Sequence, residues 1–539
     1  MNDSTTVEPQ EVAKSSTAAA RGWIEVAAFV LLCLLFVGPL TPEVNEAHYL
    51  AKARHYWHPE WCPNDHFLNS GDAHGVFYWS FGWLTTLVSF PVAAWIGRLI
   101  CWISIGIAWR RMILLVVDFP WAGLLGMVAG LAAINYLHMA GEWLIGGVEA
   151  KCFAYAFAFW GVGDALAGRW NRAWIWLGVA SAFHVLVGGW MVVCLMFAWG
   201  ICPKQRPSLV SILPGLLIGG AISLIGVVPL LLLNREVTPE DSAWASYYYV
   251  YKRLSHHLVV HSFLLEFKLR FTLTAMVWGA TAWLLRNDDR ARVLNGIVAG
   301  SLVLVLIGVF IDQYYAFIAN DDGRYLRAAQ LLRLYWFRIA DVMVPIALVV
   351  NGLVLFQRYR FRFPQRAQAA LVGLSLLVVV GMMVRFGDRW TATASPADRS
   401  TLVSDPAAWE AVGVWIEANT PEDAIFLTPR LQSTFKWYAQ RAEVVTTKDV
   451  PQDDLNLLEW IQRRGAVQWR SYNNRQTLSL AGLTEKNVLD LAEKYGVRYV
   501  VVDQVLARGD GVPVEWSFPR IYPERSEESA SYEVYEVAP

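Results

Sequence analysis

The chain has 539 residues, of which 55% are hydrophobic and only 17% are charged, and its formal net charge is -1. So few charged residues cannot cover the surface of a soluble protein of this length. No stretch is basic enough to suggest nucleic acid as a partner. We therefore expect a polytopic membrane protein whose main surroundings are the lipid bilayer.

The chain begins with a tail rich in Ser, Thr and Ala that ends at Arg21, and we expect residues 1-21 to be a disordered cytoplasmic tail. The apolar run that follows, Trp23 to Leu40, runs into Pro39 and Pro42 without a small-x-small cleavage site. We therefore interpret this run as an uncleaved first span and not as a secretory signal.

Apolar stretches of roughly twenty residues, the length that crosses a bilayer, recur about eleven times over residues 22-387. The segment from Trp174 to Ile201 is either one long tilted helix or two short ones that turn near His184. The predicted fold class is mostly α, a polytopic helical membrane protein with about 11 transmembrane helices. Their expected centres are Val30, Ile100, Leu125, Phe157, Ala180, Val193, Gly220, Val277, Val305, Leu348 and Leu376.

Lys and Arg gather in every second connection between these spans, from Arg110-Arg111 to the stretch Arg358 to Arg366. Basic connections stay on the cytoplasmic side of a membrane. This alternation predicts a cytoplasmic N-terminus and sends four other connections to the outer side. These outer loops are Gly38 to His74, His138 to Lys151, Asn234 to Lys268 and Asp312 to Arg338.

From about Asp388 onward the charge density rises and the apolar runs shorten, so we expect residues 388-539 to form a small extracytoplasmic α/β domain. Such a domain would cover or gate the membrane part, or bind a partner. Helices are expected at Pro406 to Asn419, with Asp405 as a cap, and at Glu485 to Lys494. Strands are expected at Ala424 to Leu427, Val444 to Thr447, Val497 to Val502 and Tyr532 to Val537.

The first outer loop, residues 38–74, concentrates the ionisable groups of the chain in one place. Its carboxylates include Glu43, Glu46 and Asp65, and five histidines lie among them. Glu43 stands one helical turn before Glu46, and Tyr49 one turn after it, so the three would share a helix face. Alternatively, the two glutamates cap and solubilise an interfacial helix.

The Glu43-x-x-Glu46-x-x-Tyr49 pattern, in an acidic loop directly after the first span, resembles the first-loop signature of the GT-C glycosyltransferase superfamily, such as protein mannosyltransferases and aminoarabinose transferases. The layout of many spans and a C-terminal outer domain is similar over nearly the whole chain. The segments 146–151 (GGVEAK) and 182–190 (AFHVLVGGW) also resemble an uncharacterised family of bacterial polytopic proteins. We therefore expect the protein in the bacterial plasma (inner) membrane.

This resemblance implies an enzyme that moves a sugar from a polyprenyl-phosphate donor to an unknown acceptor on the outer face. A carboxylate would then take the proton of the acceptor, and Glu46 is our first candidate, with Glu43 second. His48 and Tyr49 would help to bind the substrate. The loop has no Asp-Asp or Asp-x-Asp pair, so both the base and a divalent cation stay open.

Further candidates lie in the other outer loops. Asp65 is a second carboxylate that would contact the substrate, although a solvated loop is the alternative. Glu149 would hold the acceptor while Lys151 meets a phosphate, or the two form a surface pair. His184 either faces the cavity or bonds across helices.

The leaving lipid phosphate calls for cations at the outer surface of the bilayer. The segment from Arg324 to Arg338 supplies four arginines against the inside-positive trend. Arg333 and Arg338 are the predicted phosphate ligands, because a guanidinium fork matches phosphate oxygens, and His257 would join them. Alternatively, these arginines reach ordinary anionic headgroups.

Two other classes of function compete with the transferase. A transporter or lipid-carrier flippase would place ionisable groups near the middle of the bilayer and often shows internal symmetry, and we find no repeat. A non-catalytic membrane scaffold would have no cavity that joins the first outer loop to Arg338. The crowding of ionisable groups in the outer loops favours the transferase.

Overall fold

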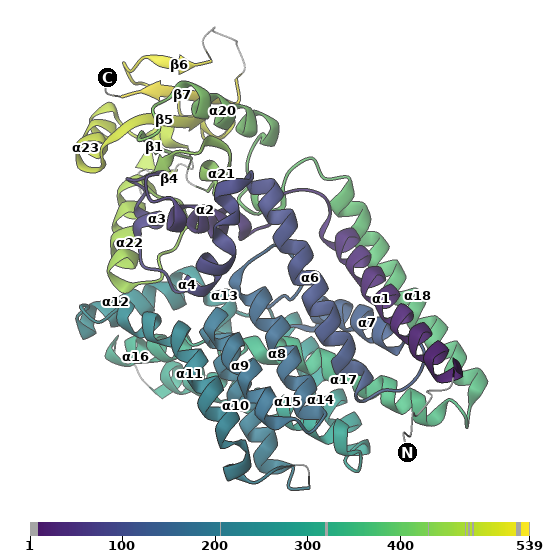
Figure 1. The fold of residues 1–539 in the computed structure, drawn as a ribbon. Helices are drawn as coiled ribbons and strands as arrows, with labels where there is room; N and C mark the ends of the chain where they lie inside the picture. Colours follow the sequence, from purple (N-terminus) through teal and green to yellow (C-terminus); the bar gives the residue numbers. More distant parts are fainter. Residues whose placement is uncertain are drawn as a thin grey trace, which may run out of the picture.

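The computed structural model describes residues 9–204, 206–318, 322–429, 431–468, 471–472, 475–476, 479–523 and 530–537. Long helices form a bundle that is capped at one end by a smaller domain around a β-sheet (Figure 1). The long helices are α1 (Pro9–Val37), α6 (Phe90–Leu114), α7 (Ala122–Leu137), α8 (Ala150–Leu166), α9 (Trp170–Phe183), α10 (Val185–Ile201), α11 (Leu209–Leu233), α14 (Leu265–Leu284), α15 (Asp289–Ile318), α17 (Arg338–Tyr359) and α18 (Pro364–Trp390).

Each expected span centre falls in a different one of these helices, so the predicted fold class is confirmed. Five stretches are long and apolar enough to cross a membrane by length and composition, and the protein is an integral membrane protein. These stretches are Ala19–Val37, Phe90–Leu114, Leu209–Leu233, Asp289–Tyr314 and Arg338–Tyr359. Residues 1–8 of the N-terminal tail lie outside the described residues, and α1 already begins at Pro9, where an Ala-rich sequence favours helix over the expected disorder.

The segment from Trp174 to Ile201 forms two helices, α9 and α10, that meet in a sharp corner at His184. The corner depends on a glycine, since a Cβ atom on Gly188 would lie 2.1 Å from the backbone nitrogen of Ser181. Close approach of backbones through small residues is typical of helices packed in membranes. Of the two arrangements that the sequence allows, the structure therefore has two short helices that turn near His184 and not one long tilted helix.

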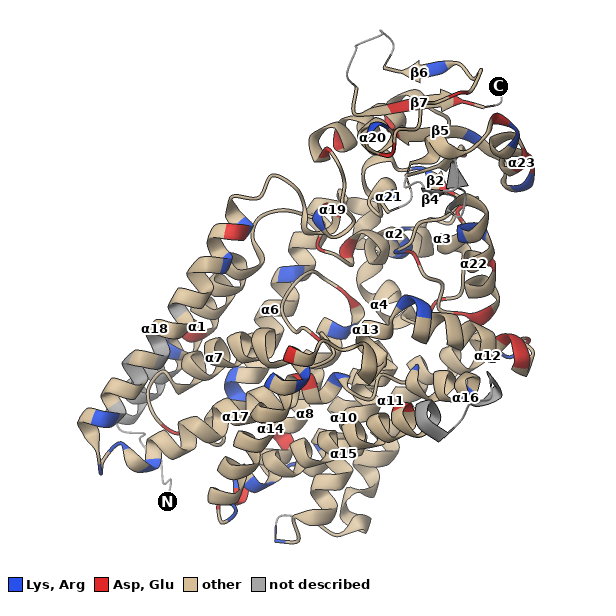
Figure 2. Cartoon of the chain, turned by 180° about the vertical axis from the view of Figure 1, so that it is seen from behind, with Lys and Arg blue, Asp and Glu red and all other residues tan. Residues whose placement is uncertain are grey.

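The basic connections lie at the end of the bundle opposite the sheet. There Arg110 pairs with Glu25 at 2.7 Å and Arg358 with Asp288 at 2.7 Å. Asp164 is fully buried at this end and is shared by three arginines, Arg111, Arg169 and Arg172. In Figure 2, stretches of ribbon coloured for Lys and Arg lie at these helix ends. The chain thus has one basic end and one end that carries the sheet.

Short helices fill the connections at the sheet end. The connection between α1 and α6 holds α2 (Glu46–Trp57), α3 (His66–Asn69), α4 (Gly75–Phe77), η1 (Tyr78–Gly82) and α5 (Leu84–Leu87). The connection between α11 and α14 holds α12 (Pro239–Tyr247), η2 (Tyr248–Arg253), α13 (Ser255–Leu258) and η3 (Val260–Ser262), and α16 (Asp322–Leu332) precedes α17.

Residues 396–537, which we call the sheet domain, contain a five-stranded sheet in the order β2-β1-β5-β7-β6. Strand β1 is parallel to β2 and β5, and β7 is antiparallel to β5 and β6. The strands of this sheet are β1 (Ile425–Leu427), β2 (Ala442–Glu443), β5 (Val497–Asp503), β6 (Arg520–Tyr522) and β7 (Tyr532–Glu536), with β3 (Ser471–Tyr472) and β4 (Arg475–Gln476) forming a separate pair. The helices are α19 (Pro396–Ser400), α20 (Pro406–Asn419), α21 (Phe435–Ala439), α22 (Asp454–Gln468), η4 (Leu480–Gly482), α23 (Glu485–Tyr495) and α24 (Gln504–Asp510).

Most elements expected in the sheet domain are found, and the Asp405 side chain caps α20 by accepting a hydrogen bond from Ala408 N at 3.1 Å. The strand expected at Val444 to Thr447 is wrong. Beyond β2 the carbonyl of Thr446 accepts a hydrogen bond from Trp460, and that of Thr447 accepts one from Arg253 in the bundle. The chain therefore leaves the sheet here and runs along the top of the bundle.

The sheet domain is fastened to the first connection of the bundle. The Trp437 ring stacks on Phe90 with centroids 5.2 Å apart, and Arg54 donates to Gln440 Oε1 at 2.6 Å. Asp453 accepts a hydrogen bond from Gly71 N at 2.7 Å. These contacts make the segment 446–454 a fixed roof over the end of the bundle.

A buried lysine with three carboxylates lies at this junction. Lys436 Nζ is 2.7 Å from Glu443, 2.7 Å from Asp449 and 3.2 Å from Asp65. Burial, together with the neighbouring Asp449, raises the pKa of Glu443 to about 7 although Lys436 opposes the shift. Three carboxylates around one ammonium group leave an excess of negative charge in a buried place, which is costly.

This excess charge predicts that Glu443→Gln stabilises the protein at high pH relative to wild type. Because the folded-state pKa is raised above that of an exposed glutamate, wild type loses stability as the pH rises from about 4.5 to about 7 and stays at the lower level above that. The variant lacks this titration. Its melting temperature relative to wild type should rise by ~2 °C or more between pH 5 and pH 8, and a constant difference would contradict the charge argument.

Candidate active site

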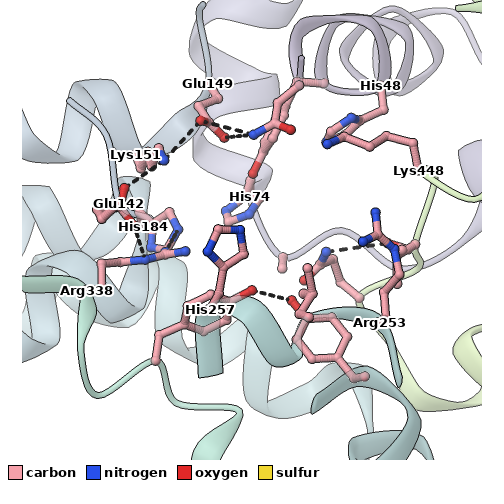
Figure 3. Close-up of a pocket in the computed structure, with 18 of the residues that line it drawn as sticks. His48, His74, Glu142, Glu149, Lys151, His184, Arg253, His257, Arg338 and Lys448 are labelled. Carbon is pink, nitrogen blue, oxygen red and sulfur yellow. Dashed lines mark hydrogen bonds and ion pairs between the residues drawn. The ribbon is translucent and has the colours of Figure 1, made fainter. Parts of the chain in front are cut away.

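A cavity of about 200 Å³ lies between the bundle and the roof. Its walls come from α2, from the connections that precede α8 and α14, from the start of α17 and from the sheet domain. Ten ionisable residues that line it are labelled in Figure 3: His48, His74, Glu142, Glu149, Lys151, His184, Arg253, His257, Arg338 and Lys448. The cavity thus joins the first connection to the start of α17.

Helix α2 presents one stripe of residues to the cavity. Asn45, His48, Tyr49 and Lys52 line it, at the i, i+3, i+4 and i+7 spacing of a single helix face. Lys52 fixes this helix against the rest of the loop, because its Nζ donates to Phe67 O and to Ser70 O at 2.8 Å each. The expected positions of His48 and Tyr49 at a site therefore agree with the geometry.

Opposite α2, an ion-paired chain of side chains forms one wall (Figure 3). Lys151 lies 2.7 Å from Glu142, and Glu142 lies 2.7 Å from Arg338 Nε. Arg338 Nη1 lies 3.0 Å from His184 Nε2, and since a guanidinium only donates, the imidazole accepts this bond. The structure thus brings together the sequence-predicted residues Lys151, His184 and Arg338, and it adds Glu142.

Backbone contacts hold this wall in place. Asp341, one turn after Arg338 on α17, accepts hydrogen bonds from Met139 N at 2.7 Å and Ala140 N at 2.8 Å. Burial alone would raise the pKa of Glu142, but Lys151 and Arg338 outweigh it and keep that pKa below its usual value. Glu142 is therefore an ionised partner of two cations and a poor proton acceptor.

Glu149 also lines the cavity and is buried, but its contacts are looser. Its oxygens lie 3.5 Å from Asn45 Nδ2 and 3.4 Å from Lys151 Nζ. Of the two carboxylates that line the cavity, Glu149 is the one that is not held tightly by a cation. A carboxylate in this position can take up a proton from a bound molecule.

The geometry does not support Glu46 and Glu43 as the catalytic pair. Glu46 does not line the cavity and accepts hydrogen bonds from Arg98 Nε at 2.8 Å and Arg98 Nη2 at 2.6 Å, both side chains being fully buried. It also accepts from Val148 N at 2.9 Å. Glu43 is likewise turned away from the cavity and pairs with Arg389 at 3.1 Å. Both glutamates hold the first connection to the bundle.

A glycine makes the close packing around Glu46 possible. A Cβ atom on Gly147 would lie 2.6 Å from Glu46 Cγ and 2.7 Å from Glu43 Cβ. The segment 146–151 can therefore lie directly on the first connection, which places Glu149 and Lys151 at the cavity. In this segment, Gly147 allows the close packing, and the charged residues Glu149 and Lys151 line the cavity.

Asp65 and Arg333 also differ from expectation. Asp65 is buried at the junction with the sheet domain, where it caps α3 and pairs with Lys436, so it contacts the sheet domain and not the cavity. Arg333 pairs with Asp454 and donates to Gln452 O at 3.0 Å. It lines a neighbouring cavity of about 380 Å³.

This second cavity continues from the first. The two share part of their walls, including Tyr49, His74, His184 and Arg338. Its other walls are partly apolar, with Val185, Leu186, Leu230 and Leu334 from the sheet ends of α10, α11 and α16–α17. Polar and apolar spaces thus meet at Arg338.

Three half-buried histidines of the site stay neutral near pH 7. Burial first, and then nearby cations such as Arg338, lower the pKa of His74 to about 4. Burial and His256 lower the pKa of His257 to about 4, and burial with Lys448 and Arg253 lowers that of His48 well below its usual value. His74 packs between the rings of Tyr49 and His184, with centroids 5.5 and 5.0 Å apart. These imidazoles therefore serve as uncharged hydrogen-bonding groups.

Lys448 is a site residue that could not be predicted from the sequence. It comes from the roof segment of the sheet domain, some four hundred residues after α2, and no local pattern marks it. Arg253 and the predicted His257, both from the third outer loop, also line the cavity. Among the described residues no group of three or more His, Cys, Asp or Glu side chains is arranged to hold a metal ion.

A family model described as a domain of unknown function (DUF6798) matches residues 407–467, in the sheet domain. No curated protein matches the sequence. The structure aligns with ArnT from Cupriavidus metallidurans bound to undecaprenyl phosphate at 13% identity and a TM-score of 0.46, over 96% of this chain and 98% of that one. The apo state of that protein gives 13% identity, a TM-score of 0.45 and the same coverage.

The arabinofuranosyltransferase AftD from Mycobacteria also aligns, at 13% identity and a TM-score of 0.45, over 96% of this chain and 40% of that one. All three TM-scores lie below 0.5, so the function proposed below depends on the residues of this chain.

Proposed function

We propose that the protein is a membrane-embedded glycosyltransferase that moves a sugar from a polyprenyl-phosphate donor to an acceptor on the outer face of a bacterial inner membrane. The observation that carries this proposal is the meeting of two unlike cavities at Arg338. One is polar and holds a loosely bound carboxylate, and the other is partly apolar. A lipid-linked sugar needs both kinds of space.

The basic end of the bundle supports the proposed orientation. Short basic connections stay in the cytoplasm, so the sheet domain and the cavities would lie on the outer side. The polyprenyl chain would lie along Val185, Leu186 and Leu230, with its phosphate at Arg338. Arg338 is ion-paired with Glu142, donates to His184 and keeps further N–H groups for a phosphate oxygen. Arg333 would contribute from the second cavity.

The chemistry follows from this placement. A hydroxyl of the acceptor gives its proton to the Glu149 carboxylate as its oxygen bonds to the anomeric carbon. The bond between that carbon and the phosphate oxygen breaks, and the electron pair leaves with the polyprenyl phosphate. The Arg338 guanidinium stabilises the negative charge that develops on the leaving phosphate. Tyr49, His74 and His257 offer neutral hydrogen-bonding groups for the sugar hydroxyls.

A transporter or flippase finds less support in the same residues. Ionisable groups that move ions through a bundle face an interior pathway. Here the buried Asp164 is neutralised by arginines at the basic end, and the buried Arg98 is neutralised by Glu46. These two buried charges thus have structural partners.

Purified protein in vesicles with a polyprenyl-phosphate sugar tests the proposal through release of polyprenyl phosphate. Arg338→Gln should lower kcat/KM for the lipid donor by about 10²-fold, because a charge-stabilising donor is lost. Arg338→Lys keeps the charge but not the fork, so we expect an intermediate loss.

The matched control is Arg327→Gln, which removes an exposed arginine of α16 from the same basic stretch. This variant should keep wild-type kinetics. Equal losses in Arg327→Gln and Arg338→Gln would attribute the effect to overall charge and not to a phosphate site, and unchanged release in Arg338→Gln would reject the proposed placement of the donor.

A further inference from the structure

The wall of the cavity opposite Glu142 and Arg338 carries two cations that form no ion pair with a carboxylate in the described part of the chain. Lys448 comes from the roof of the sheet domain, and Arg253 from the end of η2, and both line the cavity (Figure 3). Among the described residues no Asp or Glu oxygen lies within 4.0 Å of either cation. In the described part of the chain, Arg253 Nε donates a hydrogen bond to Thr447 O at 3.1 Å.

The other cations of the cavity differ in this respect. Lys52 pairs with Asp72 at 3.4 Å, Lys151 with Glu142, and Arg338 with Glu142. Those pairs hold the walls together and leave little net charge. Lys448 and Arg253 thus differ from the other cations of the cavity in that, among the described residues, no carboxylate is ion-paired with either of them.

Polar atoms beside these two cations also lack partners. His48 Nδ1 is buried without a hydrogen bond in the described part of the chain, and its imidazole faces Lys448 in Figure 3. His256 lines the cavity next to Arg253. Burial and Arg253 lower the pKa of Lys448 to about 8 although Glu149 and Asp449 oppose the shift, so the surroundings disfavour its charge. A bound anion would relieve this cost.

We propose that Lys448, Arg253 and His48 form an oxyanion subsite that binds a phosphate or carboxylate group of the acceptor. The subsite is distinct from the place of the leaving lipid phosphate, because Lys448, Arg253 and His48 do not line the second cavity whereas Arg338 does. The roof that supplies Lys448 belongs to the sheet domain, on the side where an acceptor would arrive. The assignment of this anion to the acceptor rests on the proposed function.

Binding of inorganic phosphate to the full-length protein tests the subsite without any turnover. In detergent or nanodiscs, isothermal titration should show that Lys448→Gln and Arg253→Gln each weaken phosphate binding by ~10-fold or more, the range of a charge-assisted hydrogen bond. Arg253→Lys should restore part of the affinity. Lys252→Gln, which removes an exposed lysine one residue away on η2, should bind phosphate like wild type.

Competition with polyprenyl phosphate distinguishes the proposed subsite at Lys448 from the lipid phosphate site at Arg338. If the subsite is distinct, saturating polyprenyl phosphate leaves phosphate binding at Lys448 in place, and Arg338→Gln binds phosphate like wild type. Competition between the two ligands, equal binding by Lys448→Gln and wild type, or no binding at all would overturn the subsite. Sugar transfer by Arg338→Gln and Glu149→Gln is a separate measurement, so the proposed function can fail while the subsite stands, and the reverse.

Discussion

Replacing Glu149 by Gln should lower sugar transfer by about 10²–10⁴-fold, the contribution of a general base. The side chain keeps its size and its contact with Asn45, but it can no longer take up the acceptor proton. Lys151 retains its 2.7 Å contact with Glu142, so the wall of the cavity should stay in place. Release of polyprenyl phosphate from a sugar-linked donor, at saturating donor, gives the measurement.

Two observations decide how this result is interpreted. The variant should elute and melt like wild type, and it should bind polyprenyl phosphate with unchanged affinity, because Arg338 is not altered. Transfer within about threefold of wild type would reject Glu149 as the base. A matching loss in Glu60→Gln, an exposed glutamate of the first connection, would point to a general effect of charge.

Breaking the pair between Arg98 and Glu46 should cost about 3–5 kcal/mol of stability, because either partner alone is left as an uncompensated buried charge. Arg98→Ala leaves the Glu46 carboxylate among backbone N–H groups only, and Glu46→Gln offers an amide to a guanidinium that needs an acceptor. Thermal unfolding of the protein in detergent, and the yield of folded protein, provide the measurement.

The double variant Arg98→Met, Glu46→Met is the informative comparison. Replacing both charges by apolar side chains of similar length should recover part of the stability that each single change loses. If Glu46→Gln instead folds and melts like wild type and only transfer is lost, the role of base passes to Glu46, as the first-loop pattern suggests.

Much of the fold could be predicted from the sequence because hydropathy and the placement of Lys and Arg are local signals. Each apolar run became one long helix, and the basic connections do gather at one end. The strand expected after Glu443 failed because its carbonyls bond Trp460 and Arg253, which lie far away in the sequence. Such tertiary contacts override a strand-like sequence.

The candidate site was harder to predict, and α2 shows why. Glu43, Glu46 and Tyr49 fit one helix face by spacing alone, and the sequence favours this face because carboxylates suggest catalysis. The helix begins at Glu46 and turns a neighbouring face, Asn45, His48, Tyr49 and Lys52, toward the cavity. Spacing gives the faces of a helix, but only packing against Arg98 and Gly147 selects the one that is exposed to a ligand.

Residues that come together from distant elements escape local patterns altogether. Glu149 and Arg338 were candidates because charged groups at the outer ends of spans need a reason. Lys448 had no such signal, since a lysine in a soluble domain is ordinary until the domain is docked. The position of Arg253 beside it depends on the same docking.

The docked roof also bears on how the protein matures. The residues that line the cavity range from Asn45, in the first tenth of the chain, to Lys448, Val450 and Gln452, which follow all eleven long helices in the sequence. A chain that ends before residue 448, through early termination of synthesis or through proteolysis, therefore lacks the part of the cavity wall that the sheet domain supplies. Under the proposed function such a chain would not transfer sugar, so the protein would become active only when its synthesis is nearly complete.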